Sequence, residues 1–247
     1  MIFIKTASEI DALHKSNKLV AHILNIIKEE AKTGVTTKYL DELAEDLAHH
    51  NNALPGFKGY KGFPASICAS VNNEVVHGIP NNTPLANGDL LSVDFGILLN
   101  GWYGDAAITV PIGKISTAAT KLMRVTEECL YEGINAIKLE NGVKDISKAI
   151  QIHAENNGFN VIRDYTGHGI GRELHEAPSI PNYTTRNNNY KLIPGMVIAI
   201  EPILVQYDYN TISKGWTVLT KDGGLSAHFE HTVAITNSGV SILSKQT

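Results

Sequence analysis

The chain has 247 residues, 43% of them hydrophobic and 19% charged, so it is long and apolar enough to bury a sizeable core. Its net charge of -4 lacks the basic excess of proteins that bind nucleic acid or an anionic membrane surface. Two cysteines argue against a disulfide framework, no apolar run is long enough to span a membrane, and residues 1–6 lack a signal-peptide pattern, so we expect a soluble cytoplasmic protein.

Two helices are predicted at the start of the chain. Residues 8–11 have the pattern of a capping box, and apolar residues then recur at helical spacing until Gly34 closes the helix. Thr36 and Thr37 open the second helix, which ends near residues 51–52. A loop rich in glycine and aromatic residues at 55–64 and a short strand at 66–71 follow.

Residues 90–107 are predicted to form a β-hairpin around which the chain is organised. Two apolar strands flank an Asn-Gly dipeptide, the strongest short-range hairpin signal. A two-residue turn there places Asp105 opposite Gly96, so Asp94 and Asp105 become diagonal neighbours on one face, about 7 Å apart at Cβ. Buried charges need compensation. Either one of the two carboxylates faces water, or the pair shares one or two cations.

The order of two helices followed by strands recurs from residue 116. Helices are predicted from 116 and from 143, and their serine and Gly-Val signals lie 108 residues after Ser8 and Gly34. Strands at 160–165, 196–207 and 227–235 and loops at 166–178 and 182–190 follow. We predict an α+β fold in which residues 1–247 form a single domain of two pseudo-symmetric halves, about 1–110 and 111–247.

Four acidic residues interrupt apolar strands, two in each half: Asp94, Asp105, Glu201 and Glu230. Together with one imidazole they predict a carboxylate-rich site for two divalent ions of the Mn, Fe, Co or Zn kind. Such ions polarise a water molecule into a nucleophile. Covalent catalysis is not indicated, because there is no Gly-x-Ser-x-Gly motif and Cys68 lies in no cysteine-protease signature.

The imidazole is expected in a glycine-rich loop. Five of the ten histidines lie on predicted helices, where surface positions are typical. His228 and His231 are expected on the strand face opposite Glu230, which makes them poor ligands. The remaining candidates are His77, His168 and His175, whose glycine-rich surroundings favour close approach of the backbone to a ligand.

These motifs resemble those of the type I methionine aminopeptidases, which have the pita-bread fold. The resemblance rests on residues 71–80, the acidic hairpin, and residues 167–176, 200–202 and 229–232, and it extends over essentially the whole chain. It implies five metal ligands around a central site: Asp94, Asp105, His168, Glu201 and Glu230. By resemblance, Asp105 and Glu230 bridge both ions, Asp94 chelates one, and His168 and Glu201 complete the other.

The resemblance also implies the activity, which is removal of an N-terminal methionine when the second residue is small. His175 would stabilise the developing oxyanion, Glu201 would transfer the proton of the attacking water, and His77 would contact the scissile nitrogen. The substrates implied are nascent polypeptides. Whether the protein docks on ribosomes stays open, and a monomer is expected.

The methionine side chain would lie in an apolar pocket. The family positions that form it, beside His77 and His175, are Phe57, Tyr60, Phe63, Cys68, Leu174 and Trp216, each of which could instead be a core residue. Leu174 stands where relatives often have Phe, Phe63 where many have Tyr, and Ile203 where Met is common. These exchanges are apolar for apolar, so methionine selectivity is expected while its tightness stays open.

Three other interpretations remain. Xaa-Pro peptidases of the same fold share the five ligands but usually carry a large N-terminal domain, whereas here a helix begins near residue 8. Type II methionine aminopeptidases carry an inserted subdomain, and the 26 residues from His175 to Glu201 leave no room for it. A metal-free binding module of the fold would lose ligands, and this chain retains all five.

Overall fold

The structure is a computed structural model that describes residues 2–139, 141–186 and 190–245. Within these residues there are four helices and a 3-10 turn: α1 (Ala7–Glu30), α2 (Thr37–His50), η1 (Tyr60–Gly62), α3 (Thr117–Asn135) and α4 (Val143–Asn156). The first-half strands are β1 (Leu54–Pro55), β2 (Cys68–Val71), β3 (Glu74–Val76), β4 (Leu90–Leu99) and β5 (Trp102–Pro111). The second-half strands are β6 (Asn160–Val161), β7 (Gly167–Gly169), β8 (Glu176–Ile180), β9 (Val197–Ile200), β10 (Ile203–Val205), β11 (Thr211–Lys214), β12 (Thr217–Thr220), β13 (Ser226–His228), β14 (Glu230–Thr236) and β15 (Gly239–Ile242).

One large antiparallel sheet joins the two halves of the chain. Its strand order is β1-β4-β5-β14-β9-β7-β8, with β2 paired to β4 and β15 to β14. The hairpin β4–β5 has the predicted register, in which Asp94 lies opposite Ala107 and Gly96 lies opposite Asp105. The β5–β14 pairing places Glu230 beside Ala107 and thereby joins the acidic hairpin to the second half.

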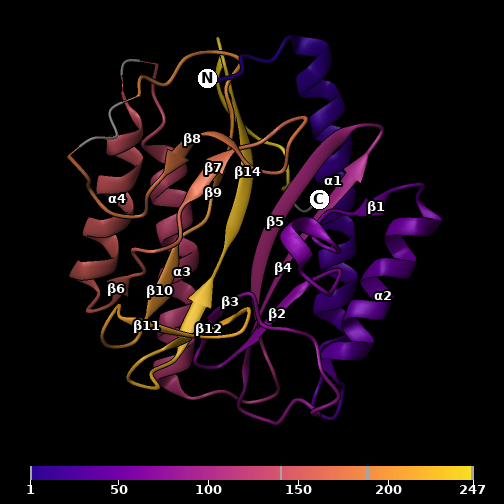
Figure 1. Ribbon diagram of the computed structural model, residues 1–247. Helices are drawn as coiled ribbons and strands as arrows, with labels where there is room; N and C mark the ends of the chain where they lie inside the picture. Colours follow the sequence, from indigo (N-terminus) through magenta and orange to yellow (C-terminus); the bar gives the residue numbers. More distant parts are fainter. Residues whose placement is uncertain (1, 140, 187–189, 246–247) are drawn as a thin grey trace.

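The helices cover the sheet in two pairs, one for each half (Figure 1). Helices α1 and α2 bury residues such as Leu24 and Leu40 against Phe95 of β4. Helices α3 and α4 form a second apolar core, in which Val125 packs with Ile198 of β9. No helix in the described part of the chain combines the length and the apolar character needed to cross a lipid bilayer.

The start and end of α1 differ from the sequence prediction. Thr6, not Ser8, is the N-cap, and its hydroxyl accepts a hydrogen bond from the backbone N–H of Glu9. The Glu9 carboxylate accepts from the Thr6 N–H in return, which completes a capping box. Both positions carry a hydroxyl, and the one three residues before a glutamate forms the box. The helix ends at Glu30, and Gly34 lies beyond it with φ of 90°.

The strands of the second half are interrupted more often than predicted. The strand expected at 196–207 is split into β9 and β10, because Pro202 has no N–H to donate to a strand ladder. The strand expected at 227–235 is split at Phe229, where the chain passes from the small sheet β13-β10-β6 to the large one. The loop expected at 166–178 contains β7 and the start of β8. Of the loop expected at 182–190, residues 187–189 lie outside the described residues.

Candidate metal centre and substrate pocket

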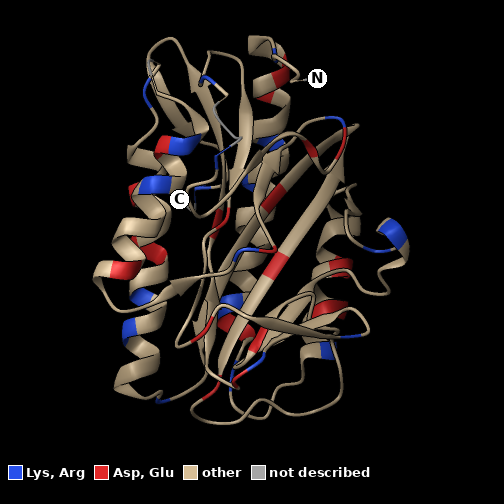
Figure 2. Cartoon of the chain, turned by 60° about the vertical axis from the view of Figure 1, so that its left-hand side comes forward, with Lys and Arg blue, Asp and Glu red and all other residues tan. Residues whose placement is uncertain are grey.

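The hairpin β4–β5 brings two carboxylates to one face of the sheet. Figure 2 shows acidic segments part-way along the long strands, and Asp94 and Asp105 occupy such positions on β4 and β5. Asp105 is 3% exposed. Burial raises the pKa of Asp94 to about 7, and burial together with the Asp94 charge raises the pKa of Asp105 well above its usual range. Both carboxyls are therefore harder to ionise than exposed ones, and a nearby cation would favour their charged forms.

His168 on β7 presents one ring nitrogen to these carboxylates. Its Nδ1 lies 2.9 Å from the carbonyl oxygen of Gly169, so it donates there and leaves the Nε2 lone pair free. This Nε2 lies 3.9 Å from Asp105 Oδ2 and 3.6 Å from Glu201 Oε1. Burial lowers the pKa of His168 to about 4. The imidazole is therefore neutral at pH 7, which is the form that binds a metal ion.

Glu201 and Glu230 lie where the second-half strands break. Glu201 follows β9 directly and precedes Pro202, and Glu230 is the first residue of β14. Ligand atoms of Asp105, His168 and Glu230 lie within 4.8 Å of one another. Burial and the neighbouring carboxylates raise the pKa of both glutamates. The two points where second-half strands are interrupted thus add two carboxylates to the hairpin pair.

Three buried oxygens of this cluster lack partners among the described residues. Asp94 Oδ1, Asp105 Oδ1 and Glu230 Oε1 make no hydrogen bond there. Unpaired carboxylate oxygens are costly in a protein interior, and a divalent cation removes that cost. Four carboxylates and one imidazole form a donor set that suits Mn, Fe, Co or Zn. The residues present therefore fit a divalent metal centre.

A cavity of about 220 Å³ opens onto the cluster, and every predicted site residue lines it. Part of the lining, which we call the acidic wall, consists of the five predicted ligands Asp94, Asp105, His168, Glu201 and Glu230. Another part, which we call the apolar wall, consists of the six predicted pocket residues Phe57, Tyr60, Phe63, Cys68, Leu174 and Trp216. The predicted catalytic histidines His77 and His175 line the same cavity.

The apolar wall is closely packed but reaches the surface. The rings of Phe63 and Trp216 meet edge to face at 5.6 Å, and Trp216 is 37% exposed. Leu174 is 1% exposed. Burial raises the pKa of the Cys68 thiol, which keeps it protonated and suits a packing role rather than a nucleophilic one. The wall thus offers an apolar side pocket beside the acidic cluster.

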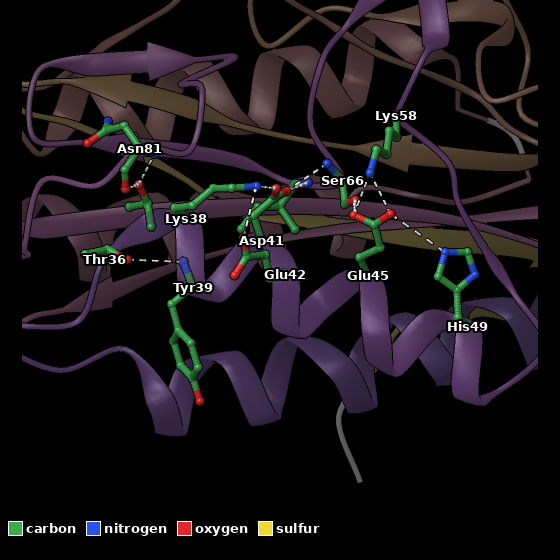
Figure 3. Close-up of polar contacts among 12 residues, drawn as sticks. Thr36, Lys38, Tyr39, Asp41, Glu42, Glu45, His49, Lys58, Ser66 and Asn81 are labelled. Atoms are coloured by element: carbon green, nitrogen blue, oxygen red, sulfur yellow. Dashed lines mark hydrogen bonds and ion pairs between the residues drawn. The ribbon is translucent and has the colours of Figure 1, made fainter.

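Helix α2 anchors the segment that carries much of the apolar wall (Figure 3). Asp41 Oδ1 accepts hydrogen bonds from the backbone N–H groups of Ser66 (2.7 Å) and Ile67 (3.1 Å), just before Cys68. Glu45 pairs with Lys58 at 2.6 Å and accepts from the Ser66 hydroxyl at 3.0 Å. Both ends of the segment between Lys58 and Ile67 are therefore fixed to one helix.

Tyr60 bonds to one of the two candidate catalytic histidines. The Tyr60 hydroxyl lies 2.9 Å from Nδ1 of His175, and the two rings stack at 5.3 Å. Burial lowers the pKa of His175 to about 3, so its ring is neutral. With the hydroxyl donating to Nδ1, the proton lies on Nε2, where it can be donated to a ligand.

His77 has a strained backbone and aromatic neighbours. Its φ is 57°, a left-handed conformation that is uncommon for residues other than glycine. Its ring meets Tyr165 edge to face at 5.3 Å and Trp216 at 6.4 Å. Tyr165 is a cavity residue that the sequence analysis did not identify.

The structure corrects the expectation for one histidine. His228 was expected to point away from the site with His231, but its side chain lines the cavity and its Nε2 lies 4.0 Å from Glu201 Oε2. Alternation along a strand places residues two apart on the same face, so Glu230 two positions later was the available signal. His231 does lie elsewhere, because its Nδ1 lies 2.9 Å from the Ser244 hydroxyl.

Comparison with known proteins shows similarity to methionine aminopeptidases over nearly the whole chain. A methionine aminopeptidase from Clostridium acetobutylicum is 50% identical over 246 residues, 98% of each chain. The crystal structure of a methionine aminopeptidase from Rickettsia prowazekii has a TM-score of 0.97 at 41% identity and covers 99% of this chain and 100% of that one. This confirms the predicted α+β pita-bread fold.

For more distant enzymes the comparison shows a shared fold. An Xaa-Pro dipeptidase from Bacillus anthracis has a TM-score of 0.79 at 21% identity, and the match covers 99% of this chain but 62% of that one. Residues 11–237 match the metallopeptidase family M24, whose members hydrolyse peptide bonds with divalent metal ions. The chain belongs to metallopeptidase family M24.

Proposed function

We propose that this protein is a methionine aminopeptidase that removes the N-terminal methionine from proteins and peptides whose second residue is small. The observation that carries the proposal is the cavity with one acidic and one apolar wall, in a chain that matches methionine aminopeptidases from end to end. The acidic wall suits hydrolysis, and the apolar wall suits a long unbranched side chain.

Two divalent ions, of the Mn, Fe, Co or Zn kind, are proposed to bind the acidic wall. Asp105 and Glu230 would hold both ions, Asp94 would hold one, and His168 and Glu201 would complete the other. When bound, such ions polarise the scissile carbonyl and lower the pKa of the attacking water. The substrate's free α-amine would lie on the side of Asp94, which restricts cleavage to the first peptide bond.

The chain's own groups would then move protons and stabilise charge. Glu201 would accept the proton of the attacking water and pass it to the leaving amine. His175 would donate its Nε2–H to the developing oxyanion, and the Tyr60 hydroxyl on Nδ1 supports that tautomer. His77 would contact the scissile nitrogen from a backbone conformation that the fold holds in place.

The context of the reaction is part of the same proposal. The substrates would be nascent polypeptides in the cytoplasm, with or without docking on ribosomes, and the enzyme would act as a monomer without nucleic acid. We also propose that residues 1–247 form a single catalytic domain of two halves, 1–110 and 111–247. The continuous sheet through β5 and β14 and the two separate helix-covered cores support this division.

A peptide panel tests the function. Met-Ala-Ser, Met-Gly and Met-Ser peptides should be cleaved far faster than Met-Leu or Met-Lys peptides, because the second side chain must fit beside the loops of His77 and His175. A chelator should abolish cleavage, and added divalent metal should restore it. Equal kcat/KM for Met-Ala and Met-Lys substrates would contradict the steric argument. Fast cleavage of Xaa-Pro peptides with any first residue would assign the chain to the Xaa-Pro peptidases instead.

A further inference from the structure

His228 has a buried ring nitrogen without a hydrogen bond. The residue is 3% exposed, and its Nε2 has no partner among the described residues. The unpartnered atoms of Asp94, Asp105 and Glu230 are carboxylate oxygens, which cations satisfy. An imidazole nitrogen that carries a proton instead needs an acceptor. The acceptor that faces it is Glu201 Oε2, at 4.0 Å.

The backbone around His228 is fixed on both sides. Its N–H donates to the Thr109 hydroxyl at 2.9 Å, and its carbonyl accepts from the same hydroxyl at 2.7 Å. On the other side, His228 pairs with Ile203 of β10, two residues after Glu201. The ring position is therefore set by two neighbouring strands rather than by a loop.

Glu201 is held at its backbone, and imidazoles face both of its carboxylate oxygens. The Asn182 side-chain amide donates to the Glu201 carbonyl at 3.0 Å. Oε1 lies 3.6 Å from His168 Nε2, and Oε2 lies 4.0 Å from His228 Nε2. The His168 nitrogen is a free lone pair, because the ring donates from Nδ1 to Gly169. In its Nε2–H tautomer, His228 can supply a proton to Oε2.

We propose that His228 is a positioning residue for Glu201, with its Nε2–H donating to Oε2 so that Oε1 is directed to the metal shared with His168. The inference rests on the proposed function, in which Glu201 and His168 complete one metal site. A shift of about 1 Å closes the gap to a charge-assisted hydrogen bond. Partners of this kind orient a ligand, and their loss costs about 10–100-fold in metal affinity or activity.

The test compares His228→Leu and His228→Gln with the wild-type protein. Metal-free protein is titrated with Co²⁺ by calorimetry, and kcat and KM are measured on Met-Ala-Ser. His228→Leu should weaken one of the two Co²⁺ sites by about 10–100-fold and lower kcat without raising KM. His228→Gln, whose amide can still donate, should restore both quantities to within a few-fold.

Two further variants keep the comparison matched. His231→Leu removes a neighbouring histidine outside the cavity and should leave Co²⁺ binding and kcat within a few-fold of wild type. If His228→Leu does not fold, His228→Asn replaces it. The asparagine side chain is also polar, but its amide is too short to reach Glu201 Oε2. His228→Asn should then resemble the loss expected for His228→Leu.

Three results would overturn the inference. Unchanged Co²⁺ affinity in His228→Leu would remove the link to Glu201. A raised KM with unchanged Co²⁺ affinity would show that His228 contacts the substrate. Weakened Co²⁺ binding that His228→Gln fails to restore would make His228 a metal ligand in its own right. If wild-type protein neither binds Co²⁺ nor cleaves Met-Ala-Ser, the proposed function itself fails, which is a separate outcome.

Discussion

The acidic wall and the apolar wall of the cavity are built from different kinds of structure. The acidic wall comes from adjoining strands of the large sheet and, for Glu201, from the residue directly after β9, and Asp105 and Glu230 are each 3% exposed. The apolar wall comes mostly from loops and a 3-10 turn, and its Trp216 at the β11–β12 turn is 37% exposed. A sheet fixes charged groups precisely enough to share a cation, whereas loops allow a hydrophobic pocket to vary.

The two walls meet at Gly96. A Cβ there would lie 2.7 Å from the Phe57 ring and 3.3 Å from Asp105 Oδ1. Gly96 also lies opposite Asp105 in the hairpin. The absence of a side chain at this position lets the apolar wall pack directly against the acidic one.

Removal of a shared ligand should have the largest effect. Asp105→Ala or Glu230→Ala should lower kcat/KM by more than about 10³-fold, because each would leave the two proposed ions under-coordinated and cost several kcal/mol of transition-state stabilisation. Activity on Met-Ala-Ser and bound metal by elemental analysis measure the effect. Glu42→Ala, which changes an exposed acid on α2, is the control and should stay near wild type. A variant of Asp105 with full activity and full metal content would contradict the proposed ligand set.

Metal removal should have a pH-dependent effect on stability. Burial raises the pKa of Asp94 to about 7 in the metal-free fold, above its unfolded value of about 4. The stability from this protonated carboxyl is therefore complete below pH 4 and is lost as the pH rises to about 7. Bound metal favours the ionised form, so the difference in Tm between metal-loaded and metal-free protein should grow from pH 4 to 7.

Calorimetric scans with and without chelator at several pH values measure that difference. For Asp94, the corresponding difference in the free energy of unfolding is on the order of a few kcal/mol. In Asp94→Asn the growth with pH should be smaller, because one of the titrating carboxyls is gone. A Tm difference that is constant from pH 4 to 7 would mean that burial does not perturb these carboxyls.

Some positions of the acidic wall can be predicted from local sequence patterns and others cannot, for physical reasons. The register of Asp94 and Asp105 follows from an Asn-Gly turn within eighteen residues, so local rules are sufficient. Glu201 and Glu230 reach the same cavity only because β14 lies between β5 and β9, a long-range pairing that no local pattern specifies. The unusual acidic residues in apolar strands indicated a shared site, and the family resemblance indicated which residues belong to it.

Two features of the site were not predicted. The direction of His228 was predicted wrongly because it was grouped with His231, although it lies two residues from Glu230 and alternation places residues two apart on the same face. The anchoring of the pocket segment by Asp41 was not predicted either, because a helical aspartate is ordinarily a solvated charge. The Asp41 contact, unlike the direction of His228, depends on three-dimensional neighbours that no local pattern specifies.

A side chain at the junction of the walls should have an intermediate effect. Gly96→Ala must displace the Phe57 ring and crowd Asp105, and overpacking of this kind costs about 1–3 kcal/mol. We expect kcat/KM for Met-Ala-Ser to fall by about 10-fold or more, with a lower Tm. Gly215→Ala, in open space at an exposed turn with φ of 62°, is a control for backbone strain without crowding. Full activity in Gly96→Ala would show that the two walls do not depend on each other.

Changes within the apolar wall should alter selectivity more than rate. Leu174→Phe should sharpen the preference for methionine at the first position, because it fills pocket space without moving the metal ligands. Norleucine should be accepted and valine should be poor, since a methylene-sized change is worth about 1–3 kcal/mol. The ratio of kcat/KM for Met-, Nle- and Val-Ala-Ser peptides measures this. A change in metal content in Leu174→Phe would contradict the separation of the two walls.

The smallest effect is expected directly beside the acidic wall, at His231. Although it adjoins Glu230, alternation along β14 turns its ring to the other face, where it contacts Ser244 and lies 6.0 Å from the Tyr131 ring. Ser244 also accepts a hydrogen bond from the Thr232 N–H, so loss of the imidazole leaves that contact in place. His231→Ala should therefore keep kcat/KM within a few-fold of wild type while Glu230→Ala loses it. A loss as large as that of Glu230→Ala would mean that His231, one residue along the strand, takes part in the metal site.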